Sequence, residues 1–91
     1  MIGDPSQKLR LLMYDLTGGR CEYCAYPTSD LHHKPFRSQK GAANDPDHLL
    51  ALCRRCHEWA HGRYIKAHER QYNIFKAWYA ALPKELNERR K

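Results

Sequence analysis

Two Cys-x-x-Cys pairs constrain the fold of this chain more than any other feature of its sequence. The pairs are Cys21 with Cys24 and Cys53 with Cys56, and they use all four cysteines of the chain. A Cys-x-x-Cys pair on a tight turn lets two thiolates reach one ion, and two such pairs complete the tetrahedron that zinc prefers. The spacing therefore predicts one structural zinc site. The alternative is two separate redox or disulfide pairs.

A zinc site would also compensate for the small size of the core. The chain has 91 residues, and a chain of that length buries only about 60–65 % of its unfolded surface. Small domains therefore usually add a metal, a disulfide or a partner. The 42 % of hydrophobic residues, together with two Trp, six Tyr and two Phe, argue against disorder. We expect a single domain over residues 1–91.

The sequence indicates neither a membrane span nor a secretory signal. Its longest apolar runs are residues 49–53 and 77–82, which are far shorter than the roughly 20 residues of a membrane span. Residues 1–15 contain no continuous apolar h-region. We therefore expect a cytoplasmic protein with no membrane partner, in a compartment where disulfides are rare.

The N-terminal segment has the pattern of an amphipathic helix. Its apolar residues recur at helical spacing, Pro5 suits the first helical turn, and two glycines at positions 18 and 19 end the pattern. We expect a helix over about residues 5–17, with Asp4 as its N-cap and its apolar stripe in the core. The stripe consists of Leu9, Leu12, Met13 and Leu16.

Patterns farther along the chain predict two strands, a long loop and two helices. Residues 29–34 and 48–53 are the strand candidates, and the segment between them contains the Pro, Gly, Asn and Asp residues typical of a loop. A helix is expected to start at Cys56. A second amphipathic pattern predicts a helix over about residues 64–82 that packs over the zinc module.

Four of the six histidines lie at positions that favour a second metal site. His32 and His33 end the first predicted strand, and His57 and His61 are four residues apart, so on a helix they point the same way. Two imidazoles on one helical face, with a third ligand from a nearby strand, can hold a divalent ion and leave coordination positions open. His68 has the pattern of an ordinary surface or core residue.

Together these residues resemble the HNH nuclease superfamily, and most of all its compact phage and bacterial members with a four-cysteine zinc site. The matching pieces are Cys21-Glu-Tyr-Cys24, Asp30-Leu-His-His33-Lys34, His48-Leu-Leu-Ala-Leu-Cys53, and Cys53-Arg-Arg-Cys56-His57 with His61. The resemblance implies an α+β fold, a small zinc-stabilised ββα-metal (treble-clef-like) finger. Its motif core would span residues 21–61, with flanking N- and C-terminal helices.

The resemblance also implies a role for each histidine of the motif. His33 would be the general base that takes a proton from the attacking water, and His32, His57 and His61 would hold a catalytic metal. That second divalent ion, Mg, Mn, Ni or Zn, would stabilise charge on the scissile phosphate and the leaving 3′ oxygen. His48 stands where the family usually has Asn, and would complete the catalytic set by bracing the loop between the strands.

The net charge of +6 favours an acidic partner, most simply nucleic acid. We expect phosphates to be met by some of six cations near the motif: Lys34, Arg37, Lys40, Arg54, Arg55 and Arg63. Because no helix has a clear base-reading pattern, the expected partner is DNA with weak sequence preference. The tail Arg89-Arg90-Lys91 has the pattern of a frayed, solvated end.

The leading interpretation is a metal-dependent endonuclease that hydrolyses DNA phosphodiester bonds in a bacterial host cell, encoded by a phage or a bacterium. It would act as a monomer or a dimer, beside a larger phage or bacterial protein partner. The alternative is a non-catalytic zinc-finger module that binds nucleic acid. A third interpretation, a zinc-stabilised protein-interaction domain, does not explain the positions of the histidines.

Overall fold

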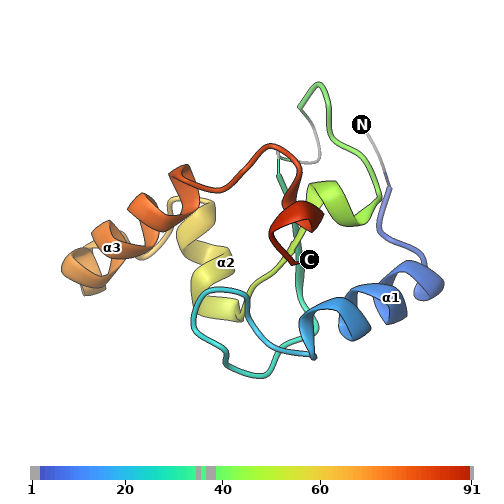
Figure 1. The fold of residues 1–91 in the computed structure, drawn as a ribbon. Coiled ribbons are helices and arrows are strands. Elements are labelled where there is room, and N and C mark those ends of the chain that lie inside the picture. The colour runs from blue at the N-terminus through green and yellow to red at the C-terminus, as the bar shows by residue number, and fades with distance from the viewer. Residues whose placement is uncertain (1–2, 35, 37–38, 91) are drawn as a thin grey trace.

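The computed structural model describes residues 3–34, 36 and 39–90. This part of the chain has an α+β fold, in which two short strands and three α-helices follow the order α1, β1, β2, α2, α3 (Figure 1). The succession β1, β2, α2 gives the ββα order that was expected, and α1 and α3 are the flanking helices. In the described residues, no helix combines the length and hydropathy that crossing a membrane requires.

The sheet consists of two antiparallel strands, β1 (Leu31–His33) and β2 (Leu49–Ala51). His32 lies opposite Leu50 in this register. Both strands are shorter than the predicted residues 29–34 and 48–53. The pairing nevertheless continues at the ends, because the amide of Leu52 donates to the carbonyl of Asp30 and the amide of Lys34 donates to that of His48.

The first cysteine pair sits on a tight turn that is fastened to β2. The amide of Ala25 donates to the carbonyl of Cys21, and Ala25 itself has a positive φ of 66°. Glu22 then makes two bonds to one residue of β2: its amide donates to the carbonyl of Ala51, and its carboxylate accepts from the amide of Ala51. These bonds fix the turn against the sheet.

The second cysteine pair opens helix α2 (Arg54–Ala60), for which Cys53 is the N-cap residue. The cysteines are themselves part of the core, as expected for a small domain that lacks a large apolar interior. The buried cluster combines residues of the cysteine turns, the second strand, both C-terminal helices and the C-terminal segment. It contains Cys21, Leu50, Leu52, Cys53, Cys56, Trp59, Phe75 and Leu86.

Helix α1 (Gln7–Thr17) is capped and buried differently from the prediction. Its N-cap is Ser6, whose hydroxyl accepts from the amide of Leu9, and not Asp4. The predicted core stripe is also wrong, because Met13 alone of its four residues is buried, while Leu12 and Leu16 are 45 % and 37 % exposed. Only one turn of α1 therefore contributes to the interior.

The predicted helix over residues 64–82 is divided in two. A 3₁₀ turn over Ile65–His68 precedes helix α3 (Glu69–Ala80). Gly62 and Tyr64 both adopt left-handed backbone conformations, with φ of 75° and 58°, which stops α2 from running on into the next segment. Helix α3 packs on the cysteine module through Phe75, as the amphipathic pattern predicted.

The segment after α3 returns to the sheet as far as Arg90 and is not the solvated end that its charges suggested, while Lys91 lies outside the described residues. The Arg90 guanidinium bonds to the Glu22 carboxylate at 2.7 Å and to the carbonyls of Pro46 and Leu49. The side chains of Arg90 and Glu22 are only 6 % and 7 % exposed. Arg89 adds a second bond to Glu22. This segment therefore joins the first cysteine turn to β2.

Candidate active site

The four cysteine sulfurs form one cluster in which all ligand atoms lie within 4.8 Å of one another. Sγ of Cys24 and Sγ of Cys53 are 3.6 Å apart, so the two pairs meet across the cluster, and all four cysteines are free. Four thiolates in a tetrahedral set are typical of structural zinc. The cysteines are thus clustered to bind a metal such as zinc, as their spacing predicted.

The local electrostatics of the cluster favour loss of a proton from one thiol. A hydrogen bond from Cys56 lowers the pKa of Cys21 to about 4. The same contact, together with burial, raises the pKa of the Cys56 thiol. Zinc binds thiolates, so the Cys21 thiol is poised to bind as a thiolate. The other thiols release their protons when the metal binds.

A second group of possible ligands consists of His32 on β1, His57 on α2 and His61 at the C-cap of α2. One ring nitrogen from each lies within 4.8 Å of the others. The three ring centroids are nearly equidistant, at 5.1 to 5.2 Å. The structure therefore brings together the three histidines predicted as a metal site, and we refer to them below as the three-histidine cluster.

Burial favours the uncharged form of two of these histidines, His32 and His57. Desolvation lowers the pKa of His32 to about 3, and the neighbouring His57 and His61 act in the same direction. Burial also lowers the pKa of His57, again with a contribution from His61. A metal ligand must be a neutral imidazole, so the environment favours the protonation state that ligation needs.

Two aromatic residues that the sequence interpretation did not assign to the site contact the three-histidine cluster. The Tyr79 hydroxyl lies 2.8 Å from Nε2 of His32. The Phe36 ring stacks on the His61 ring, with centroids 4.9 Å apart and planes 12° apart, and its edge meets His32. The amphipathic pattern over residues 64–82 predicted a helix that packs over the zinc module, but it did not indicate which residue Tyr79 would contact.

His33 is held by an amide from the long loop. Nε2 of His33 lies 2.7 Å from Oδ1 of Asn44, while Nδ2 of Asn44 donates to the carbonyl of Gly3. Because the amide nitrogen is used toward Gly3, its oxygen faces the ring and accepts a hydrogen from Nε2. In the neutral ring Nδ1 then carries the lone pair. The ring is buried, and the bond to Asn44 leaves Nδ1 as its hydrogen-bond acceptor.

His33 and the three-histidine cluster open onto one cavity of about 270 Å³. His32 and His33 are neighbours on a strand, where side chains alternate between faces, but β1 ends at His33 and both residues line this space. The N-terminal segment closes it with Asp4, Pro5 and Arg10. Arg10 is a cation near the cluster that sequence reasoning missed, because no motif extends to it.

The structure does not bring His48 into this cavity. Its Nδ1 lies 2.7 Å from the Asp45 carboxylate, and its amide donates to the same side chain. The carbonyl of His48 accepts from the amide of Lys34. His48 therefore braces the loop before β2, while Asn44 supplies the amide that contacts His33.

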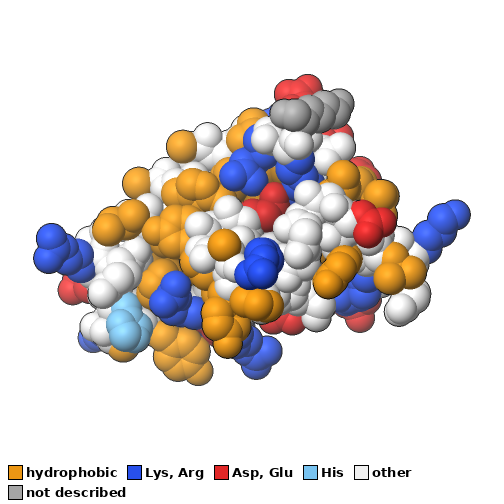
Figure 2. Space-filling model, turned by 60° about the horizontal axis from the view of Figure 1, so that its bottom comes forward, with side chains coloured by type: hydrophobic (Ala, Val, Ile, Leu, Met, Phe, Trp, Pro, Cys, Tyr) orange, Lys and Arg blue, Asp and Glu red, His pale blue; other side chains and the backbone are white. Residues whose placement is uncertain are grey.

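The basic residues predicted to meet phosphate have different environments. Lys34 is half-buried and donates to the carbonyl of Tyr79; Lys40 is exposed; Arg37 lies outside the described residues. Arg54 and Arg63 both pair with Glu58, and Arg55 lies over the Trp59 ring. On the face shown in Figure 2, Lys and Arg side chains are scattered among hydrophobic ones and form no single patch.

Residues 21–63 match the family model described as HNH endonuclease. No curated protein and no solved structure shows a significant match to the chain. The matched range contains the four cysteines, the three-histidine cluster, His33, Asn44 and His48.

Proposed function

We propose, from the match of residues 21–63 to the HNH endonuclease family model, that this chain is a metal-dependent endonuclease acting on DNA phosphodiester bonds. The nuclease family accounts for a nucleic-acid-related function. The observation that supports catalysis, and not binding alone, is the shared cavity: an oriented imidazole and three further imidazoles with neighbouring ring nitrogens line the same space.

In this proposal the three-histidine cluster holds the catalytic metal. A divalent ion there would act as a Lewis acid toward the scissile phosphate and the leaving oxygen. Since Tyr79 engages Nε2 of His32, we expect Nδ1 to be the ligating nitrogen of that ring. Three protein ligands leave coordination positions open for substrate, in contrast to the four-cysteine cluster, which is complete.

His33 is the proposed general base. Its Nδ1 takes a proton from a water molecule as the water oxygen attacks phosphorus. The bond from phosphorus to the 3′ oxygen breaks, and that oxygen leaves with a proton from solvent, giving a 5′-phosphate and a 3′-hydroxyl. An imidazole suits this task because it can be neutral near physiological pH. Arg10 lies in the same cavity, where its charge can bind the phosphate.

We further propose that residues 1–91 act as one domain. Both flanking segments contact the site or the finger: Tyr79 of α3 bonds to His32, and Arg90 bonds to Glu22. The phage or bacterial origin, the protein partner and the oligomeric state stay predictions from the sequence.

A plasmid-nicking assay tests the proposed activity. Supercoiled plasmid is incubated with the protein and Mg²⁺, Mn²⁺, Ni²⁺ or Zn²⁺, and separately with chelator. Conversion to nicked or linear DNA should require metal and should be abolished in His33→Ala at unchanged zinc content. His68→Ala, which alters an exposed histidine outside the cavity, is the matched control and should cut normally.

The alternative function makes a different prediction in the same assay. A non-catalytic zinc module would retard DNA in a gel but would leave plasmid supercoiled with every metal. That outcome for the wild-type protein would replace the nuclease proposal with nucleic-acid binding alone.

A further inference from the structure

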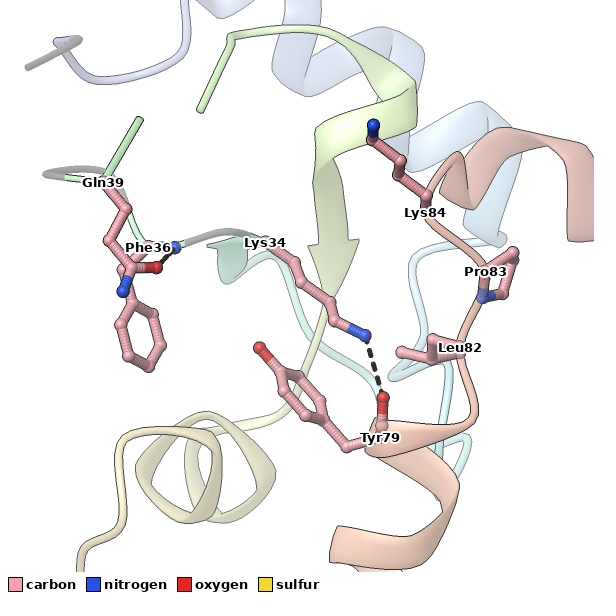
Figure 3. Close-up of a pocket in the computed structure, with 7 residues that line it drawn as sticks. All are labelled: Lys34, Phe36, Gln39, Tyr79, Leu82, Pro83 and Lys84. Carbon is pink, nitrogen blue, oxygen red and sulfur yellow. Dashed lines mark hydrogen bonds between the residues drawn. The ribbon is translucent and has the colours of Figure 1, made fainter. Parts of the chain in front are cut away.

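Figure 3 shows the residues that line a second cavity, of about 370 Å³. It shares Phe36 with the cavity of the three-histidine cluster. It is formed by the chain that follows β1 and by the end of α3 with the residues after it. The residues that line it are Lys34, Phe36, Gln39, Tyr79, Leu82, Pro83 and Lys84. Two of these residues also contact the three-histidine cluster: Phe36 stacks on His61, and Tyr79 bonds to His32.

The walls of this cavity are suited to a flat ring. Phe36 and Tyr79 contribute aromatic side chains, and Leu82 and Pro83 contribute apolar ones. The Tyr79 ring already stacks on Phe75 and has Nζ of Lys34 over it, so Phe36 is the ring on which a base can stack. One face of Phe36 is used by His61, which fixes the plane of the ring. Nucleobases stack on aromatic side chains of this kind with little dependence on their identity.

The charges at the cavity are positive. Its described lining contains two lysines and no acidic residue. Lys34 is half-buried, with Nζ 4.5 Å from the centre of the Tyr79 ring, and no carboxylate among the described residues pairs with it. Lys84 lies across the cavity and is exposed. An apolar slot with unpaired cations at its edge fits a base that is attached to phosphates.

We propose that this cavity binds one unpaired nucleobase of the DNA strand beside the scissile phosphate, with Lys34 and Lys84 on the adjacent phosphates. The inference rests on the proposed nuclease function and adds a substrate class to it. A base within an intact duplex is paired and stacked on both sides, so it cannot enter without being extruded. The chain should therefore bind single-stranded or unpaired DNA more tightly than duplex.

A direct test uses small probes and the whole zinc-loaded chain, with no cleavage involved. Thymidine 5′-monophosphate and 2-deoxyribose 5-phosphate differ only in the base. The first should saturably shift the NMR signals of the Phe36 and Tyr79 rings, and the second should not. Equal shifts from both probes would mean that the cavity attracts phosphate only, and no shift from either would mean that it is not a nucleotide site. Both results would overturn the proposal.

A pair of variants extends the test to DNA. Leu82→Trp fills the cavity, whereas Ile74→Trp places the same side chain on an exposed position of α3. In fluorescence anisotropy without added divalent metal, Leu82→Trp should weaken binding of an eight-nucleotide single strand about tenfold, the scale of one lost stacking contact. Duplex binding should not change, and Ile74→Trp should behave as wild type.

The outcomes separate this inference from the function on which it rests. Unchanged single-strand affinity in Leu82→Trp would overturn the base-binding cavity but would leave plasmid cleavage untouched. A chain that binds the thymidine probe in this cavity and never cuts DNA would support the cavity and count against the nuclease.

Discussion

The Tyr79 hydroxyl on helix α3 lies 2.8 Å from Nε2 of His32 on strand β1. The two residues are 47 positions apart, so this bond connects the C-terminal helix to the candidate metal site. Partners of this kind fix the orientation of a ligating imidazole and typically account for about ten- to hundredfold in metal affinity.

Replacing Tyr79 by Phe should therefore weaken metal binding at the three-histidine cluster. We expect Mn²⁺ affinity, measured by isothermal titration calorimetry, to fall about tenfold, because the variant lacks the hydrogen bond that orients the His32 ring. Zinc content should be unchanged. Tyr72→Phe, a half-buried tyrosine on the same helix, is the control. Equal Mn²⁺ affinity in the two variants would mean that Tyr79 only packs.

Asn44 should control the base strength of His33. Asn44→Leu removes the acceptor at Nε2, and we expect plasmid cleavage to slow about tenfold, the value of one hydrogen bond of about 1.4 kcal/mol, with unchanged Mn²⁺ affinity.

Asn44→Asp is the informative companion to that variant. A carboxylate beside His33 stabilises the imidazolium and raises the pKa of the ring, so the acid limb of the pH–rate profile should move to higher pH. A profile that stays at the wild-type position would show that His33 is not the base.

Acid should destabilise the fold through His32. Its folded pKa of about 3 lies below the ordinary histidine pKa of 6.5, so as pH falls from 6.5 toward 3 the unfolded chain takes up a proton that the folded chain does not. Stability is therefore lost over that window. Urea unfolding between pH 4.5 and 7 should show a shallower pH dependence in His32→Gln than in wild type. Parallel slopes would assign the acid sensitivity to other groups.

The buried pair of Arg90 and Glu22 should make a large contribution to stability. Arg90→Ala leaves the Glu22 carboxylate without its closest partner, and breaking such a pair costs about 3–5 kcal/mol. Arg89→Ala removes a more exposed bond to the same carboxylate and should cost about 1 kcal/mol or less. Urea denaturation of both variants measures the loss in free energy of unfolding. Similar losses in the two variants would contradict the larger contribution assigned to Arg90.

Removal of zinc should unfold the chain, because Cys21, Cys53 and Cys56 are core residues. A strong chelator should abolish near-ultraviolet circular dichroism, and Zn²⁺ should restore it. His57→Ala lacks one residue of the three-histidine cluster only, so it should remain folded under the same starting conditions. If the chelated wild-type chain kept its near-ultraviolet circular dichroism, the apolar contacts alone would be sufficient to maintain the fold.

The residue pairs within both candidate metal-ligand clusters were predictable because the spacing inside each pair is local. Cysteines three positions apart share a turn, and His57 and His61 share a helical face whatever the rest of the chain does. The α+β class followed from the same motif. These relations depend on backbone geometry over a few residues, which a sequence displays directly.

The supporting contacts were not predictable in this way. Arg90 and Glu22 are 68 positions apart, and a basic tail has the same composition whether it is solvated or buried. Asn44 likewise follows from the path of the long loop, which fixes its distance to His33. The prediction that the apolar stripe of α1 is buried failed for a related reason. Periodicity identifies an apolar face, but a two-stranded sheet offers too little surface to cover all of it.

Cys56 and His57 are consecutive residues of helix α2, one in each metal-ligand cluster. Displacement of one therefore moves the other, since a single turn of helix carries both. Oxidants attack thiolates and not imidazoles under ordinary conditions. Peroxide that oxidises the cysteines and releases their metal would nevertheless also separate the histidine side chains of the three-histidine cluster. Oxidation of the cysteines would in this way change the geometry of the three-histidine cluster, whose own side chains are not oxidised.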